Sequence, residues 1–185
     1  MIKRISHLVI LYTFLFGTAI FVQSCCNDED TITIVGNGTM EIFNSSTNGN
    51  VPVEGDITGA FVVFVTPETE ISDVTEFGLM NSAYAVSCDF EFANNIQLES
   101  LVLTCDKSFE LGDLTIEAGT DLLNFDGVVV PSVSNLRLSA EVLITFTNTF
   151  TDQAVFEESV HTFTINMSTD DGLDIVNSAT AVFRL

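Results

Sequence analysis

The sequence predicts an all-β protein, specifically an antiparallel β-sandwich that follows a cleaved N-terminal signal segment. Apolar and polar residues alternate with period two in several segments, as in strands with one buried face. Turn signals built from Asn, Asp and Gly separate these segments. With 46% hydrophobic residues and 16 Phe in 185 residues, the chain has enough apolar side chains for a sizeable core. We therefore expect one sandwich domain over residues 31–185, with an immunoglobulin-like arrangement among the options, although the chain has no Trp.

The clearest alternation covers residues 83–93, where Tyr84 and Cys88 share the apolar face. Asn94-Asn95 follows, and Asn tolerates the positive φ of a tight hairpin. The sequence thus predicts a hairpin between this strand and a second strand over 96–105. The apolar parity of the second strand changes near Glu99-Ser100, which predicts a β-bulge there.

This hairpin decides what the sequence says about Cys88 and Cys105. In the predicted register their Cα atoms lie roughly 13 Å apart, at ~3.3 Å per residue. A disulfide needs a separation of at most ~7 Å. We therefore expect free, buried thiols, and the alternative is that the turn is wrong and that an exported domain pairs its two cysteines.

Further strands and turns are expected along the rest of the chain. The strong strands are 135–149 and 154–167, joined by a turn at Thr151-Asp152-Gln153, and the second of them changes parity between Phe156 and Phe163. Weaker strands are predicted at 31–35, 38–43, 59–66, 109–117, 122–125, 128–130 and 179–185. Turns are predicted at Thr47-Asn48-Gly49-Asn50, Asp126-Gly127 and Asp170-Asp171-Gly172, and the stretch 67–82 reads as a short helix or a loop.

The first thirty residues have the order of an export signal. Lys3 and Arg4 precede an uncharged apolar run over residues 8–22. A membrane-spanning helix needs about 20 residues, whereas the apolar region of a secretory leader has about 7–15. The run therefore predicts a cleaved leader, with a retained membrane anchor as the alternative.

The segment Val22-Gln23-Ser24-Cys25 resembles a bacterial lipobox, and Asp28, Glu29 and Asp30 after it resemble the surface-export tag of Bacteroidota-type lipoproteins. The resemblance implies a signal peptide over 1–24, an acidic tether over 25–30 and an acylated Cys25. Cys26 is the less suitable acceptor, because Cys25 rather than a small Ser would precede the cut. It also implies that a lipid anchor holds the protein on the outer face of the outer membrane. An ordinary cleaved leader is the alternative.

The negative net charge disfavours two classes of partner. All 26 acidic residues lie beyond residue 24, where only Lys107, Arg137 and Arg184 are basic, so the mature charge is 3 − 26 = −23. Nucleic acid is not expected as a partner, because phosphate binding requires Lys and Arg. Direct adsorption to anionic lipid is disfavoured for the same reason.

The sequence offers few candidate catalytic residues. His161 is the only histidine beyond the leader, and its alternating strand predicts a solvated or partly packed position. There is no G-x-S-x-G elbow to supply a nucleophile. One His and two Cys 17 positions apart, with no C-x-x-C, do not predict a zinc site.

Calcium is the one metal for which the sequence offers candidates. Asp170, Asp171 and Asp174 surround Gly172, and a second set is Asp121, Asn124 and Asp126. Carboxylates are suitable Ca²⁺ ligands, but neither set has EF-hand spacing, and Asp-Gly also forms ordinary turns. We expect turns here, and no cofactor.

These observations together predict a non-enzymatic cell-envelope protein with a structural, adhesive or accessory binding role and a protein or glycan partner at the cell surface. Three alternatives remain open. One is a hydrolase that uses acidic residues, with or without Ca²⁺. Another is a pilus-type subunit whose segment 179–185 completes a neighbour's sheet. The last is a small-ligand carrier with a hollow barrel.

Overall fold

The computed structural model describes residues 31–45, 52–53, 55–71, 91–129, 134–136 and 139–184, with the backbone alone described at 52–53, 134–136 and 139. The chain divides into two compact units. One comprises Met1–Thr31 and Ile71–Glu91, and the larger comprises Ile32–Glu70 and Phe92–Leu185. Only the ends of these segments are described for the smaller unit, so the fold below is that of the larger one.

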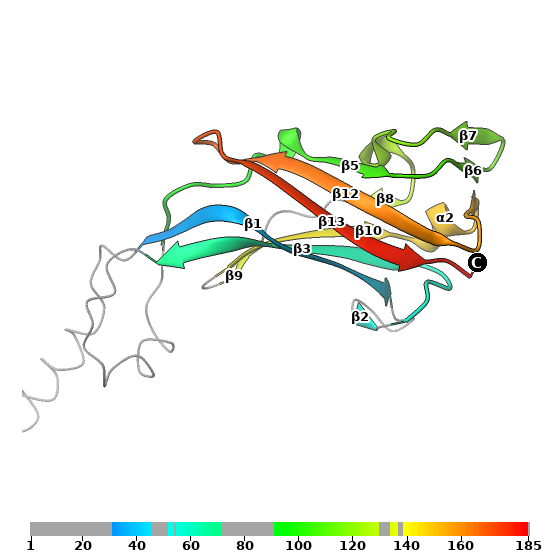
Figure 1. The fold of residues 1–185 in the computed structure, drawn as a ribbon, viewed down its shortest axis with the longest axis horizontal. Coiled ribbons are helices and arrows are strands. Elements are labelled where there is room, and N and C mark those ends of the chain that lie inside the picture. Colours follow the sequence, from blue (N-terminus) through cyan, green and yellow to red (C-terminus); the bar gives the residue numbers. More distant parts are fainter. Residues whose placement is uncertain are drawn as a thin grey trace, which may run out of the picture. The chain divides into compact units, whose positions relative to one another are not determined.

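Strands form nearly all of the regular structure in the described residues (Figure 1). They are β1 (Thr31–Ser45), β2 (Pro52–Val53), β3 (Phe61–Ile71), β4 (Glu91–Phe92), β5 (Val102–Cys105), β6 (Phe109–Leu111), β7 (Leu114–Ile116), β8 (Val128–Val129), β9 (Ser134–Leu136), β10 (Ser139–Phe146), β11 (Ala154–Val155), β12 (Val160–Ser168) and β13 (Asp174–Val182). The described helices are short: η2 (Leu98–Ser100) and η3 (Leu122–Asn124) are 3₁₀ turns, and α2 (Asn148–Thr151) is a single α-helical turn.

The strands pair into three sheets. The largest has the order β2-β1-β3-β10-β8, with β4 beside β1 and β9 beside β10. The other two have the orders β13-β12-β5 and β11-β6-β7, and every pairing with a described register is antiparallel. The all-β prediction is confirmed, whereas the sandwich and its immunoglobulin-like form stay predictions.

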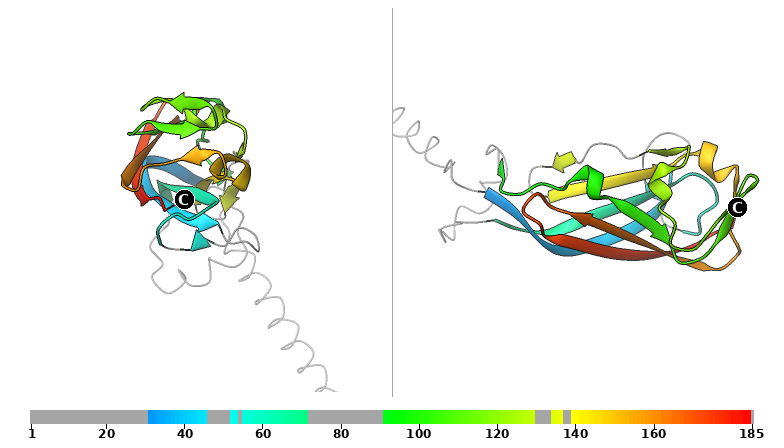
Figure 2. Two further views of the ribbon diagram at one scale, coloured as in Figure 1. Left: turned by 90° about the vertical axis from the view of Figure 1, so that its right-hand side faces the viewer. Right: turned by 90° about the horizontal axis from the view of Figure 1, so that it is seen from above.

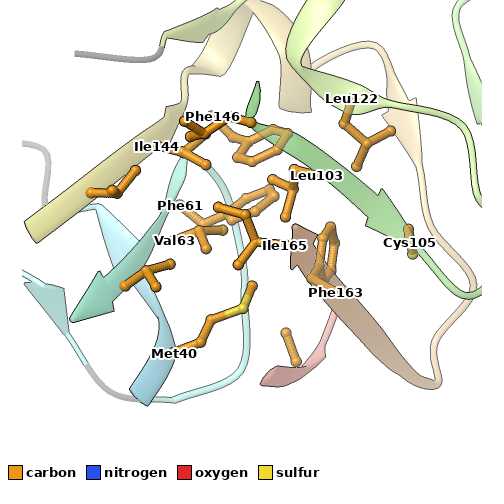
Figure 3. Close-up of a cluster of buried hydrophobic side chains, with 14 of the residues drawn as sticks. Met40, Phe61, Val63, Leu103, Cys105, Leu122, Ile144, Phe146, Phe163 and Ile165 are labelled. Carbon is orange, nitrogen blue, oxygen red and sulfur yellow. The ribbon is translucent and has the colours of Figure 1, made fainter. Parts of the chain in front are cut away.

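Aromatic side chains connect the largest sheet to the β13-β12-β5 sheet. Phe61 of β3 stacks on Phe146 of β10 with ring centroids 4.3 Å apart, and meets Phe163 of β12 edge-on at 5.9 Å. Figure 3 shows these rings among Leu103, Ile144 and other aliphatic side chains that point toward one another from both sheets. Seven phenylalanines are buried, as the sequence pattern predicts: Phe61, Phe109, Phe146, Phe150, Phe156, Phe163 and Phe183.

The hairpin of β12 and β13 is the most regular part of the fold. Nine residue pairs run from Val160↔Val182 to Ser168↔Asp174, and the two strands lie side by side along their length (Figure 2). The predicted turn at Asp170-Asp171-Gly172 connects them. The segment 154–167, where a change of parity was predicted, forms two separate strands. β11 ends at Val155 and pairs with β6, and β12 starts at Val160.

The predicted hairpin at Asn94-Asn95 is wrong. Beyond β4 the amide of Ala93 donates to the carbonyl oxygen of Ile32 in β1, whereas β5 pairs with β12 in the other sheet. Asn94 is only 2% exposed, and its Oδ1 accepts from the amide of Ile34 at 2.8 Å. Its Nδ2 donates to the carbonyl oxygen of Ile34 at 3.0 Å. The Asn94 side chain thus makes the hydrogen bonds that the backbone of a neighbouring strand would otherwise make to Ile34. The chain then crosses to the β13-β12-β5 sheet instead of turning back.

This correction changes the argument about the cysteines. The estimate of roughly 13 Å assumed the absent hairpin, so it no longer applies. Cys105 is nevertheless a free, buried thiol, as expected, and Cys88 lies outside the described residues. The parity change near Glu99-Ser100 is the 3₁₀ turn η2 rather than a β-bulge.

Five other parts of the chain differ from prediction. The long strand expected over 135–149 is the β9–β10 hairpin followed by α2, and the strand expected over 109–117 is the β6–β7 hairpin. Residues 122–125 contain η3 rather than a strand. The strands expected at 31–35 and 38–43 are one strand, β1, and β3 extends to Ile71. The leader, Cys25, Cys26, Tyr84, the turn at residues 47–50 and residues 72–82 lie outside the described residues.

Gly38 occupies a position in β1 that a side chain cannot share. Its φ is +71°, and a Cβ built there would overlap the carbonyl oxygen of Thr66 and lie 2.6 Å from the amide nitrogen of Glu68. β1 and β3 are neighbours in the sheet, so this close approach belongs to the pairing itself.

We predict that Gly38→Ala lowers the free energy of unfolding by about 2–5 kcal/mol, combining about 1–2 kcal/mol of left-handed strain with about 1–3 kcal/mol of overpacking. Gly119→Ala is the matched control, because Gly119 also has a positive φ (+81°) but nothing lies within 4 Å of its built Cβ. Denaturant unfolding of both variants measures the difference. Equal losses in the two variants would contradict the steric argument.

Candidate functional site

Three chemically distinctive side chains meet at one end of the β5–β12 pair. Cys105 and His161 both face the core, and the register pairs Cys105 with Phe163, two residues along the same face from His161. Asp106 follows Cys105 directly and is exposed. One potential ligand atom from each residue lies within 4.8 Å of the others.

His161 is fully buried, so the predicted solvated or partly packed position is wrong. Its ring lies edge-on to Phe156 and Phe183, with centroid distances of 5.3 Å and 5.4 Å. Nε2 is 3.0 Å from the carbonyl oxygen of Glu157. A carbonyl oxygen can only accept, so Nε2 carries the proton, and in the neutral imidazole Nδ1 then holds a lone pair.

That lone pair faces the thiol of Cys105. Sγ lies 3.7 Å from Nδ1 of His161 and 3.9 Å from Oδ1 of Asp106. Burial raises the pKa of the Cys105 thiol, and the side chain is only 3% exposed. A Cys-His nucleophile needs a thiolate that substrate can reach. The burial and the raised pKa of Cys105 both oppose that chemistry.

Asp106 continues the β5–β12 ladder with its side chain. Its amide donates to the carbonyl oxygen of Thr162 at 2.9 Å, and the amide of Thr162 donates to its Oδ1 at 2.8 Å. This hydrogen bond from the Thr162 amide is the main reason why the pKa of Asp106 is lowered, with smaller contributions from the charge of Lys107 and from His161. The cluster therefore combines a buried thiol and imidazole with an exposed, charged carboxylate.

Sequence reasoning missed this cluster, because Cys105 and His161 are 56 positions apart and no spacing motif connects them. The only sequence signal was parity, since each residue falls on the apolar face of its strand.

The predicted calcium candidates at the β12–β13 turn have structural partners instead. Asp171 accepts hydrogen bonds from the hydroxyl of Thr169 and from Nδ2 of Asn94, the latter at 3.1 Å. Asp170 accepts from the amide of Asn95 at 3.0 Å, and Asp174 is an exposed residue at the start of β13. In the described part of the chain, ligand atoms converge only at Cys105, Asp106 and His161, so Asp170, Asp171 and Asp174 do not form such a group.

The second acidic set also stabilises local structure. Oδ1 of Asp121 accepts from the amides of Leu123 and Leu103, both at 3.2 Å, and so holds η3 against β5. Oδ2 of Asp121 accepts from Nδ2 of Asn124 at 2.9 Å. The predicted turn at Asp126-Gly127 is present, with a φ of +84° at Gly127.

The outward face of the β13-β12-β5 sheet is nearly free of charge. Twelve side chains alternate with the buried ones and point outward: Val102, Thr104, Val160, Thr162, Thr164, Asn166, Ser168, Asp174, Val176, Ser178, Thr180 and Val182. Asp174, at one end, is the only ionisable member. We call these twelve residues the neutral face.

Hydroxyl groups on the neutral face form ranks across the strands. The register places Thr104, Thr164 and Ser178 side by side, and the hydroxyls of Thr164 and Ser178 are 3.0 Å apart. Thr162 and Thr180 form the next rank. Beyond Asn166 the face continues into a recess of about 230 Å³. Its polar lining comes from Ser100, Asn166, Ser168 and Asp174.

Comparison with known proteins adds no assignment. No protein-family model matches the chain, and no curated protein matches it. Among the residues that the structure describes, no helix is long and apolar enough to cross a membrane.

We predict that Asp171 makes stability depend on pH. Hydrogen bonds from Thr169 and Asn94 lower its pKa in the folded protein. The stabilisation is therefore present above the unfolded pKa of about 3.9 and is lost as pH falls through the lower folded value. Asp171→Asn should unfold more easily than the wild type at pH 7, and the difference should shrink below about pH 4.

Thermal unfolding from pH 7 to pH 2.5 measures this difference. Asp113→Asn, in the exposed β6–β7 turn, controls for the loss of one negative charge. A gap between the wild type and Asp171→Asn that stays constant at all pH values would refute the assignment.

Proposed function

We propose that this chain is a lipid-anchored, non-catalytic protein of the outer cell surface that binds an uncharged polysaccharide through the neutral face. One observation carries the binding role: a chain with a net charge of −21 keeps a whole sheet face with a single carboxylate at its end. The anchor and the location rest on the leader and its resemblance to a lipobox.

Charge supports an uncharged partner. Anionic polymers meet repulsion from the rest of this acidic chain, and no Lys or Arg lies on the neutral face to offset it. Threonine and serine hydroxyls both donate and accept hydrogen bonds, and valine and threonine methyls offer apolar contact. These are the groups that match the hydroxyls and C–H surfaces of a neutral sugar.

The residue types favour a glycan over a protein partner. Protein interfaces are enriched in aromatic residues, Met and Arg and depleted in Ser. The neutral face has none of those enriched types and carries hydroxyls instead. Because it also lacks an aromatic ring for stacking, each sugar contact is weak, and we expect binding to polymers that engage many anchored copies at once.

Three observations weigh against the alternatives. Neither Asp106 nor Asp171 suits the role of a hydrolase's general acid, because their pKa values are lowered and that role needs a raised one. Phenylalanine rings pack between the largest sheet and the β13-β12-β5 sheet, where a carrier would need a cavity. Phe183 is fully buried and bridges to Ile57, so donating segment 179–185 to a neighbour would remove a core residue.

We predict that the acylated protein, anchored in many copies on uncharged lipid vesicles, sediments with insoluble neutral polysaccharides and not with anionic ones. Ser178→Glu places a charge in the central hydroxyl rank and should weaken binding at least about tenfold, by about 1.4 kcal/mol or more. Val155→Glu is the matched control, because Val155 is 66% exposed on β11, outside the neutral face. Binding is measured by depletion from solution across a panel of neutral and anionic polymers.

Two results would overturn the binding role. One is that none of the neutral polymers retains the wild type. The other is equal binding by the wild type and Ser178→Glu. Sedimentation of the protein without polysaccharide tests a second copy as the occupant instead, since dimers that Ser178→Glu dissociates would assign the neutral face to self-association.

We predict that the mature N-terminus is an acylated Cys25. Two or more acyl chains anchor a protein stably, at ~0.8 kcal/mol per buried methylene. Cys25→Ala should abolish acylation and detergent-phase partitioning, and Cys26→Ala should leave both unchanged. Mass spectrometry of the mature terminus reads the result. An unmodified terminus at or beyond residue 25 would refute the anchor.

A further inference from the structure

We infer that Cys105, Asp106 and His161 form a binding site for Zn²⁺ or a divalent ion of similar ligand preference. The three residues supply one sulfur, one nitrogen and one oxygen, with the ligand atoms within 4.8 Å of one another. Three protein ligands plus one solvent position is the usual set of an open zinc site.

Two of the three separations between ligand atoms already approach those of a tetrahedral site. Bond lengths of about 2.3 Å to sulfur and about 2.0–2.1 Å to nitrogen or oxygen place a sulfur ligand about 3.6 Å from a nitrogen or oxygen ligand in a tetrahedral site. Sγ of Cys105 lies 3.7 Å from Nδ1 of His161 and 3.9 Å from Oδ1 of Asp106. Shifts of a few tenths of an ångström in these two separations would bring them to the tetrahedral value.

The surroundings of His161 orient it as a ligand. Its Nε2–H donates to the carbonyl oxygen of Glu157, which leaves the lone pair on Nδ1, the atom that faces the thiol. Metal-binding histidines usually donate their other ring N–H to a carbonyl or a carboxylate in this way. Edge-on packing against Phe156 and Phe183 fixes the ring plane.

The donor set decides the class of ion. Ca²⁺ and Mg²⁺ prefer ligand shells made of oxygen, whereas thiolate and imidazole suit Zn²⁺ and Co²⁺. Cys105 and His161 are buried, whereas Asp106 is exposed, so a solvent ligand would have to approach from the Asp106 side. A water molecule would complete the coordination there.

Binding is coupled to one proton. The Cys105 thiol loses its proton to solvent when sulfur bonds to the ion, so one Zn²⁺ enters and one H⁺ leaves, with no change of oxidation state. Affinity should therefore rise with pH as the ion competes with the proton for sulfur.

Co²⁺ titration of the metal-free full-length protein tests the site, because Co²⁺ bound to thiolate gives a charge-transfer band in the near ultraviolet. We expect one Co²⁺ per chain, displacement by Zn²⁺, and a higher melting temperature with Zn²⁺. Cys105→Ala should abolish both the band and the thermal shift. This variant also excludes Cys25, Cys26 and Cys88 as the source of the band.

Asp106→Asn is the second variant, and it keeps a side-chain oxygen to accept from the amide of Thr162. It should weaken Co²⁺ binding at least about tenfold. Asp113→Asn, which removes an exposed carboxylate elsewhere, should bind as the wild type does. The site is refuted by a wild type without a thiolate band, by a band that persists in Cys105→Ala, or by equal affinities of Asp106→Asn and Asp113→Asn.

Discussion

The described fold depends on one buried polar side chain, Asn94, which stands where the chain leaves the largest sheet for the β13-β12-β5 sheet. Its amide group satisfies both backbone groups of Ile34 in β1 and also donates to Asp171 in the β12–β13 turn. A buried group left unsatisfied costs about 1–3 kcal/mol, so few other residues suit this position. Because Asn94 ends the pairing with β1, the following segment is free to reach β12, and the position of β5, Cys105 and the neutral face follows from that crossing.

The sequence predicts best those features that depend on residues close together in the chain. Alternation with period two is a property of each strand by itself, and the phenylalanines that it places at inward positions, such as Phe163, are buried. It failed at Asn94-Asn95, where the same residue type that makes hairpin turns bonds instead to Ile34, 60 positions away. The segment 109–117 was likewise predicted as one strand, although its apolar positions change parity between Leu111 and Leu114, as a two-residue turn at Gly112-Asp113 requires.

The error at Asn94 also hid the candidate metal site. Pairing segment 83–93 with segment 96–105 places Cys105 near Tyr84, whereas the actual partner of β5 is β12, which carries His161. Recognising the cluster requires that pairing, its register and the parity of both strands, none of which is contained in a spacing motif. The neutral face has the same origin, since Thr104, Thr164 and Ser178 form a rank only in the observed register.

A sheet without charge on its outward face normally risks edge-to-edge aggregation. β13 lies at the edge of its sheet, and both ends of that edge are occupied within the chain. Oδ1 of Asn37 accepts from the amide of Val176 at 3.0 Å, and Ile57 exchanges backbone hydrogen bonds with Val182 and Arg184, both at 2.8 Å. Only the short stretch around Ser178 lies between these contacts, too little for a long strand to pair. The acidic residues elsewhere add repulsion between copies. Local contacts along β13 and the overall charge both oppose the pairing of copies at this edge, which agrees with the proposal that the neutral face binds a different, uncharged partner.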